Sequence, residues 1–156
     1  NSLIEGVLSV IDTLTAKDLI VNQIATFFGK VVFNGDVSFG GRPTFNADTA
    51  GYALIPKESD HVEVKFKKEY ETEPVINASP VSTELTDDSF KKLSEDGFCD
   101  HNQDKTICQD KLDKAILAES LQFVIASRST QGFVIKLGKS AVHDITFSWS
   151  ALAVDE

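Results

Sequence analysis

Residues 31–42 have the sequence VVFNGDVSFGGR, which is two copies of one six-residue unit. Each unit places an apolar residue first, an aromatic residue third and a glycine fifth. Residues i and i+2 of a strand lie on the same face, so Val31 and Phe33 form an apolar pair. Gly35 then allows the backbone to turn sharply before the next pair. Each hexapeptide is therefore expected to be a minimal strand followed by a corner.

The same six-residue period extends beyond these two units. Its two apolar registers are Leu19, Ala25, Val31, Val37 and Pro43, and Val21, Phe27, Phe33, Phe39 and Phe45. A single-chain solenoid needs roughly three such strands per coil, so five units would complete fewer than two coils. Three chains wound together would instead bury these side chains along a shared axis and pair their strand edges. We therefore predict that residues 19–50 form a β-helical or β-prism stalk in a homotrimer, with an ordinary β-meander as the alternative.

Two phrases within this segment, FNGDV at 33–37 and GGRPTF at 40–45, resemble the repeats of trimeric β-helical shafts. Such shafts occur in phage tail fibres and bacterial surface fibres, so the resemblance implies a fibre protein. Upstream, the apolar residues follow the four-three-four spacing of a short heptad seam, at Leu3, Val7, Val10 and Leu14. Fewer than three heptads with several β-branched residues hold a helix poorly. Residues 1–18 are therefore expected to be a lead-in, either a short coiled coil or a continuation of the shaft.

From Gly51 onward the pattern changes to longer segments that alternate polar and apolar residues. The alternation is clearest in residues 61–67, 132–137 and 144–151, and strands are also expected at 73–78 and 121–126. In the last strand the inward set is Ile145, Phe147 and Trp149. The sequence thus predicts an all-β protein whose C-terminal part, residues 51–156, is a six-stranded antiparallel β-sandwich head.

This head resembles the H-type lectin domain, a six-stranded sandwich that forms trimers. The resemblance is carried by VKF at 64–66, Tyr70, EPV at 73–75, STQGF at 129–133 and FSWSA at 147–151. In those lectins an arginine and an aromatic residue near the loop before the last strand contact the sugar. Here that loop, residues 138–144, contains neither. A different polar ligand is therefore expected, contacted by Lys139, His143 and Asp144, although a lone histidine in a loop is often an exposed bystander.

An acidic insertion, residues 84–118, interrupts the head with nine acidic residues and five lysines. Part of it matches the first positions of an EF-hand or dockerin-type calcium loop, with oxygen ligands at Asp100, Asn102, Asp104 and Thr106. Lys111 occupies the position of the usual closing carboxylate, so Asp110 would have to close the site through an altered loop. Calcium is one predicted cofactor, and a solvated loop without metal is the alternative. Short helices are expected at 89–93 and 109–118.

The two cysteines of the chain, Cys99 and Cys108, lie in this polar insertion. Their closeness predicts one local disulfide and hence an oxidising compartment, which places the protein outside a cell or on a cell or virion surface. The formal net charge of −9 argues against nucleic acid as a partner, because phosphate contacts need clustered Lys and Arg. We also expect no membrane insertion, because no apolar run approaches the roughly 18 residues of a span.

The sequence contains no nucleophile elbow, zinc-protease signature or phosphate-binding glycine loop, so we predict a protein that is not an enzyme. The leading hypothesis is a trimeric extracellular fibre tip that acts as an adhesin or receptor-binding module for a surface glycan or protein. The alternative is a purely structural trimerisation cap. A third hypothesis is a polysaccharide-degrading enzyme of the tailspike type.

Overall fold

The computed structural model describes residues 6–118 and 122–154. The chain separates into two compact units, Asn1–Arg42 and Pro43–Glu156, which we describe one at a time. None of the described helices is both long and apolar enough to cross a membrane.

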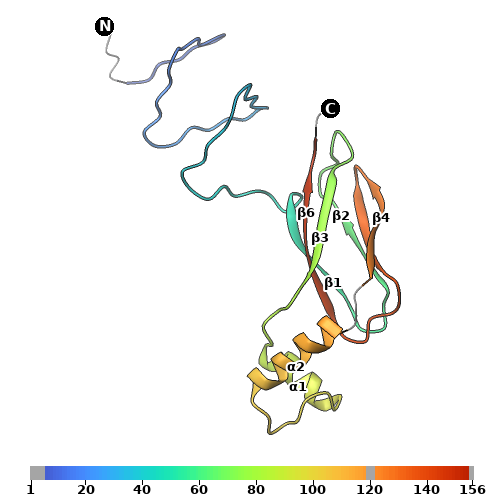
Figure 1. Cartoon of the computed structure of the whole chain (residues 1–156). Helices are drawn as coiled ribbons and strands as arrows, with labels where there is room; N and C mark the ends of the chain where they lie inside the picture. Colours follow the sequence, from blue (N-terminus) through green and yellow to red (C-terminus); the bar gives the residue numbers. More distant parts are fainter. Residues whose placement is uncertain (1–5, 119–121, 155–156) are drawn as a thin grey trace. The chain divides into compact units, whose positions relative to one another are not determined.

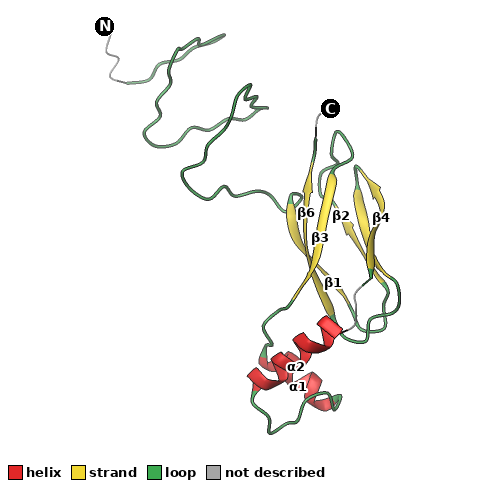
Figure 2. Cartoon of the chain, viewed as in Figure 1, coloured by secondary structure: helices red, strands yellow, loops and turns green. Residues whose placement is uncertain are grey.

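The unit Pro43–Glu156 is built on two three-stranded antiparallel sheets, which Figures 1 and 2 show facing one another. Sheet A has the strand order β1-β6-β3, and sheet B has the order β2-β5-β4. The bounds are β1 Ala50–Ile55, β2 His61–Lys65, β3 Val75–Val81, β4 Phe123–Ser129, β5 Gly132–Leu137 and β6 Ile145–Leu152. The prediction of an all-β head with antiparallel strands is confirmed. Leu121, the expected first residue of the fourth strand, lies outside the described residues.

The core lies between the two sheets because alternate residues of each strand point inward. In β6 the predicted inward residues Ile145, Phe147 and Trp149 are 1%, 0% and 8% exposed. They pack with inward residues of the facing sheet, such as Phe133 and Ile135 of β5, in a single apolar cluster. The predicted inward side of β6 is therefore confirmed.

At two glycines another part of the protein lies so close that a Cβ atom would not fit. A Cβ at Gly132 would lie 2.2 Å from the carbonyl oxygen of Val64 on the paired strand β2. A Cβ at Gly51 would lie 2.9 Å from the indole ring of Trp149. Real Cβ contacts are not this short, so both positions require glycine for packing.

The insertion forms a small helical lobe with its own apolar cluster. Helix α1 spans Asp87–Glu95 and helix α2 spans Lys105–Ala118. The predicted disulfide between Cys99 and Cys108 is present, with a Cα–Cα distance of 5.7 Å, and Leu85 is buried beside it. Helix α2 starts four residues earlier than expected because the Asp104 carboxylate accepts a hydrogen bond from the Thr106 amide at 2.8 Å and caps the first turn.

Residues 6–49 form no helix or strand in the structure of one chain. There is thus no evidence here for a β-helical stalk in residues 19–50, and the last of these residues already belongs to β1. The lead-in is likewise not helical over residues 6–18, and its Leu3 lies outside the described residues. Short hexapeptide strands and a two-heptad helix lack partners within one chain, so neither is expected to form in a single copy. The trimeric stalk stays a prediction.

Candidate functional site

The loop that precedes β6 carries the three predicted ligand-binding residues, and two of them make contacts within the protein. The Asp144 carboxylate accepts a hydrogen bond from the backbone amide of Lys57 at 2.8 Å. The ring of His143 meets the ring of Phe98 edge to face, with centroids 4.6 Å apart. Lys139 is exposed. The structure thus uses His143 and Asp144 to attach this loop to the β1–β2 turn and to the insertion.

Backbone hydrogen bonds hold the same loop against the β1–β2 turn. The amide of Ala141 donates to Ser59, and the amide of Glu58 donates to Ala141, both at 2.8 Å. Within the turn, a 2.6 Å contact with the His61 ring lowers the pKa of the Asp60 carboxyl. Of the three predicted binding residues, His143 and Asp144 thus hold the loop in place. The exposed side chain of Lys139 is the one that remains available for a ligand.

The residues predicted to bind calcium lie in different local settings. The Asp100 carboxylate accepts a hydrogen bond from the Asn102 amide at 2.9 Å. Asp104 caps helix α2, and its hydrogen bonds from Thr106 lower the pKa of its carboxyl. Asp110 lies within that helix and pairs with Lys114 at 2.5 Å.

The ligands of an EF-hand lie at positions 1, 3, 5, 7, 9 and 12 of its loop, whereas here helix α2 begins at Lys105, the sixth position, so the seventh position, Thr106, already lies in the helix. Within residues 6–118 and 122–154 there is no group of three or more His, Cys, Asp or Glu side chains placed to hold a metal ion. This arrangement does not fit an EF-hand type of coordination. Calcium binding stays a prediction that the geometry of the single chain does not favour.

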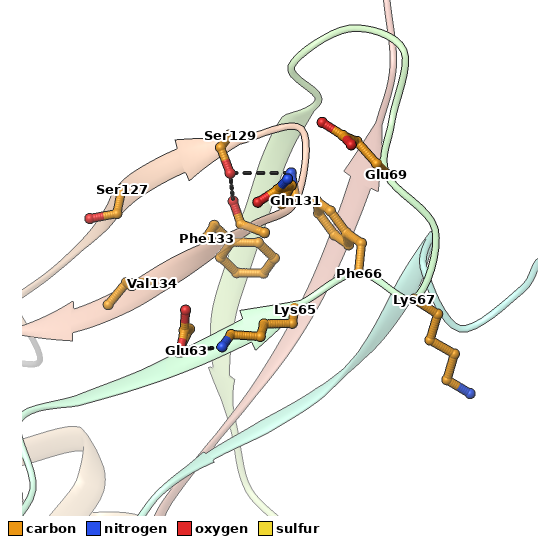
Figure 3. Close-up of a pocket in the computed structure, with 11 residues that line it drawn as sticks. Glu63, Lys65, Phe66, Lys67, Glu69, Ser127, Ser129, Gln131, Phe133 and Val134 are labelled. Atoms are coloured by element: carbon orange, nitrogen blue, oxygen red, sulfur yellow. Dashed lines mark hydrogen bonds and ion pairs between the residues drawn. The ribbon is translucent and has the colours of Figure 1, made fainter.

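A hollow of about 530 Å³ lies over strands β2, β5 and β4 of sheet B (Figure 3). Figure 3 shows Glu63 and Lys65 of β2 on one side and Ser127 and Ser129 of β4 on the other. The rings of Phe66 and Phe133 lie beneath, with centroids 5.9 Å apart. The remaining lining residues are Lys67, Glu69, Gln131, Gly132 and Val134.

The polar groups around the hollow are balanced in charge and largely exposed. Glu63 and Lys65 form an ion pair at 3.4 Å, and Glu69 accepts a hydrogen bond from the Thr130 hydroxyl at 2.6 Å. An exposed ion pair of this kind stabilises the fold by less than about 1 kcal/mol, so its side chains are free to exchange partners. Carboxylates, ammonium groups, hydroxyls and an amide together offer both donors and acceptors. This chemistry suits a neutral, hydroxyl-rich ligand better than a strongly charged one.

Backbone irregularity shapes the rim of the hollow. The pairing of β4 with β5 shifts register between Ala126 and Ser129, and Ser127 has a φ of 48°. A left-handed conformation at a residue other than glycine is strained and is frequently associated with functional sites. In the sequence the 129–133 turn carries only the family resemblance, and the hollow could not be predicted because its lining comes from strands that are far apart in the chain.

Comparison of the chain with models of protein families, with curated protein sequences and with solved structures found no match. The site must therefore be interpreted from its own geometry.

Proposed function

We propose that this chain is the distal part of a homotrimeric extracellular fibre and that it acts as a binding module. In this proposal the hexapeptides of residues 19–45 from three copies form a β-helical stalk, and residue 50 belongs to β1 of the head. The H-type lectin-like sandwich unit is the head that contacts a surface glycan or a surface protein. The disulfide between Cys99 and Cys108 supports an oxidising location.

The observation that carries the proposal is a regular series of exposed aromatic side chains. In the single chain Phe27, Phe33, Phe39 and Phe45 are 66%, 67%, 65% and 66% exposed, at an exact spacing of six residues. The companion residues Val31 and Val37 are also more than two-fifths exposed. Scattered apolar residues are ordinary on protein surfaces, whereas a periodic row of this kind is typical of a contact surface.

The energetics favour burial of this row by other copies. Fully burying a phenylalanine contributes about 1.5–3 kcal/mol, so four that are two-thirds exposed leave roughly 4–8 kcal/mol per chain unrealised. A typical domain is stable by only about 5–15 kcal/mol. Identical copies are the simplest partner, because each brings the same row at the same spacing.

Measurement of the native mass of the full chain tests the trimer directly. We expect an assembly of three chains at micromolar concentration by native mass spectrometry and by light scattering. A folded species with the mass of one chain, unchanged on concentration, would refute the proposal.

Two neighbouring residues provide a matched pair of variants for the stalk. Phe27 lies in the six-residue register, whereas Phe28, which is 101% exposed, lies outside it. Phe27→Ser is expected to raise the dissociation constant of the trimer at least tenfold, because one buried side chain is lost in each of three chains. Phe28→Ser is expected to leave the constant unchanged. Equal effects of the two substitutions would indicate that the spacing carries no assembly function.

The hollow of sheet B is the ligand site that we propose for the head. Its mixed donors and acceptors suit the hydroxyl groups of a glycan, and three heads on one fibre would convert weak single contacts into useful avidity. Gln131→Ala should then weaken binding to a glycan array or to whole cells, and Lys139→Ala, in the loop before β6, serves as the comparison. If only Lys139→Ala weakens binding, the ligand is contacted at the loop and not at the hollow.

A structural trimerisation cap is the second candidate function. It is favoured by the contacts of His143 and Asp144, which hold the loop before β6 within the protein. A trimer that binds neither glycans nor cells, and whose hollow variants behave like the parent protein, would support this alternative.

A further inference from the structure

The outward face of sheet A differs in character from the rest of the surface. Alternation with the buried residues places eleven side chains on this face, which we call the neutral face: Ala50, Tyr52, Leu54, Val75, Asn77, Ser79, Val81, Thr146, Ser148, Ser150 and Leu152. None of the eleven is charged, although one residue in four of the chain is, so about three charges would be expected. The outward side of sheet B, in contrast, carries Glu63, Lys65 and Lys136.

Large apolar side chains stand exposed on the neutral face. Tyr52 is 76% exposed, and Leu54, Val75 and Leu152 are each about half exposed. The centre of the face, on β6, holds small hydroxyl side chains instead. Exposed apolar groups around a neutral, hydrogen-bonding centre are typical of a surface that another protein covers.

The charge of the whole chain indicates which partner covers this face. Each copy carries a formal net charge of −9, so two copies that meet through acidic surfaces repel one another. A face without charges removes that repulsion at the contact, and its serine, threonine and asparagine side chains pair equally well with their own kind. These properties favour a second copy of the chain over a basic partner.

On the neutral face the exposed Tyr52 side chain and a shallow depression lie in the same row of paired residues across the sheet. A shallow depression of about 400 Å³ lies over Ser79, Ser148, Asn77 and Ser150, on β3 and β6. Tyr52, on the edge strand β1, is paired with Ser148, which in turn is paired with Ser79, so all three lie in one row across the sheet. If three heads are related by a three-fold axis parallel to the strands, each row of paired residues lies at the same height along the axis in all three heads. The β1 edge of one head then meets the β3 edge of the next head, with Tyr52 level with the depression.

We infer that the neutral face is the surface through which three heads contact one another, with Tyr52 of each head seated over Ser79 and Ser148 of the next. This inference rests on the proposed trimeric fibre. Three strands spaced about 4.8 Å apart and up to eight residues long cover only about 350 Å², whereas a stable complex buries roughly 800 Å² on each partner. The heads would therefore associate only when the stalk holds them at high local concentration. Sheet B and its hollow are then left facing solvent.

Inter-chain distances between spin labels test which sheet faces the axis. Both native cysteines are in the disulfide, so a single introduced cysteine can be labelled selectively. Thr146→Cys places a label on the central strand of sheet A, outside the inferred Tyr52 contact, and Lys136→Cys places one on the central strand of sheet B. In the trimer we expect the Thr146 distance to be shorter by roughly 20 Å. The sheets of a sandwich lie about 10 Å apart, and moving a label about 10 Å away from a three-fold axis lengthens the distance between copies by about 17 Å. Equal distances, or a shorter one at Lys136, would overturn the inference and leave the trimer intact.

A charge placed on each face provides the second arm of the test. Tyr52→Glu should lengthen the Thr146 distance and broaden its distribution, while the thermal unfolding of the head stays unchanged. Val124→Glu, at a 56% exposed position on β4 of sheet B, is the matched control and should change neither. If Val124→Glu separates the heads and Tyr52→Glu does not, the inference is wrong. If the parent chain has the mass of one copy and shows no inter-chain distance at all, it is the proposed fibre that fails.

Discussion

Phenylalanines in the two units of the chain experience opposite environments. Phe133 and Phe147 of the sandwich are 1% and 0% exposed, whereas Phe33 and Phe39 of the N-terminal segment are 67% and 65% exposed. The sandwich strands find a facing sheet within the same chain, but the hexapeptides are too few to cover one another. A periodic row of apolar residues can therefore be as regular as the inward face of a core strand and still have no partner within one chain.

The largest effect is expected from making the same substitution in both units. Phe147→Ala removes a fully buried ring and should lower the free energy of unfolding of the sandwich by about 3–5 kcal/mol. Phe33→Ala should leave that free energy unchanged and weaken only the assembly. The chain has a single tryptophan, Trp149, in the sandwich core, so its fluorescence during denaturation measures the sandwich alone. If Phe33→Ala destabilised the sandwich as well, the two units would not be independent.

A second expected effect concerns the insertion, whose apolar cluster is separate from that of the sandwich. The Cys99–Cys108 bridge closes a loop of about ten residues, so its loss should destabilise the insertion by about 2–3 kcal/mol. Replacing both cysteines with alanine should reduce the helical circular-dichroism signal at elevated temperature. The midpoint reported by Trp149 fluorescence should move little. Simultaneous loss of both signals would show that lobe and sandwich unfold together.

Two glycine substitutions, one in each unit, are expected to have effects of intermediate size on stability. Gly132→Ala forces a Cβ against the Val64 carbonyl and should destabilise the sandwich by roughly 1–3 kcal/mol. Gly35→Ala is the matched control, because a Cβ at Gly35 meets no atom within 4 Å in the single chain. Urea denaturation followed by fluorescence should therefore separate the two variants. An effect of Gly35→Ala on native mass, with unchanged fluorescence, would locate that glycine in the assembly.

The smallest expected effect is the pH dependence of the helix α2 cap. The hydrogen bonds from Thr106 hold the pKa of Asp104 below its usual 3.8, so folding favours the ionised carboxyl. The stabilisation is present above pH 3.8 and is lost as the pH falls through the depressed pKa. Carbon-13 NMR titration of the side chain should report the low pKa. Asp104→Asn keeps a capping oxygen and should remove this part of the acid sensitivity. An unshifted Asp104 would contradict the cap.

Most of the sandwich could be predicted from particular residues. The alternation in residues 132–137 and 144–151 identified strands β5 and β6 and the inward side of the latter, because burial on one face of a strand leaves a period of two. The predicted disulfide is also present. The contacts around the candidate site could not be predicted from the sequence. The loop of Lys139, His143 and Asp144 was identified by family resemblance, yet the contacts of His143 and Asp144 depend on Phe98 and Lys57, far away in the sequence.

Local spacing in the sequence was sufficient to predict five of the six strands, the disulfide and the periodic row of aromatic residues, whereas β1 was not anticipated. The uncharged face of sheet A, the position of the hollow on sheet B and the need for glycine at position 132 could be recognised only once the strands were assembled. Each of these depends on which strands become neighbours. Strand order and register arise from packing of the whole unit, and no single segment encodes them.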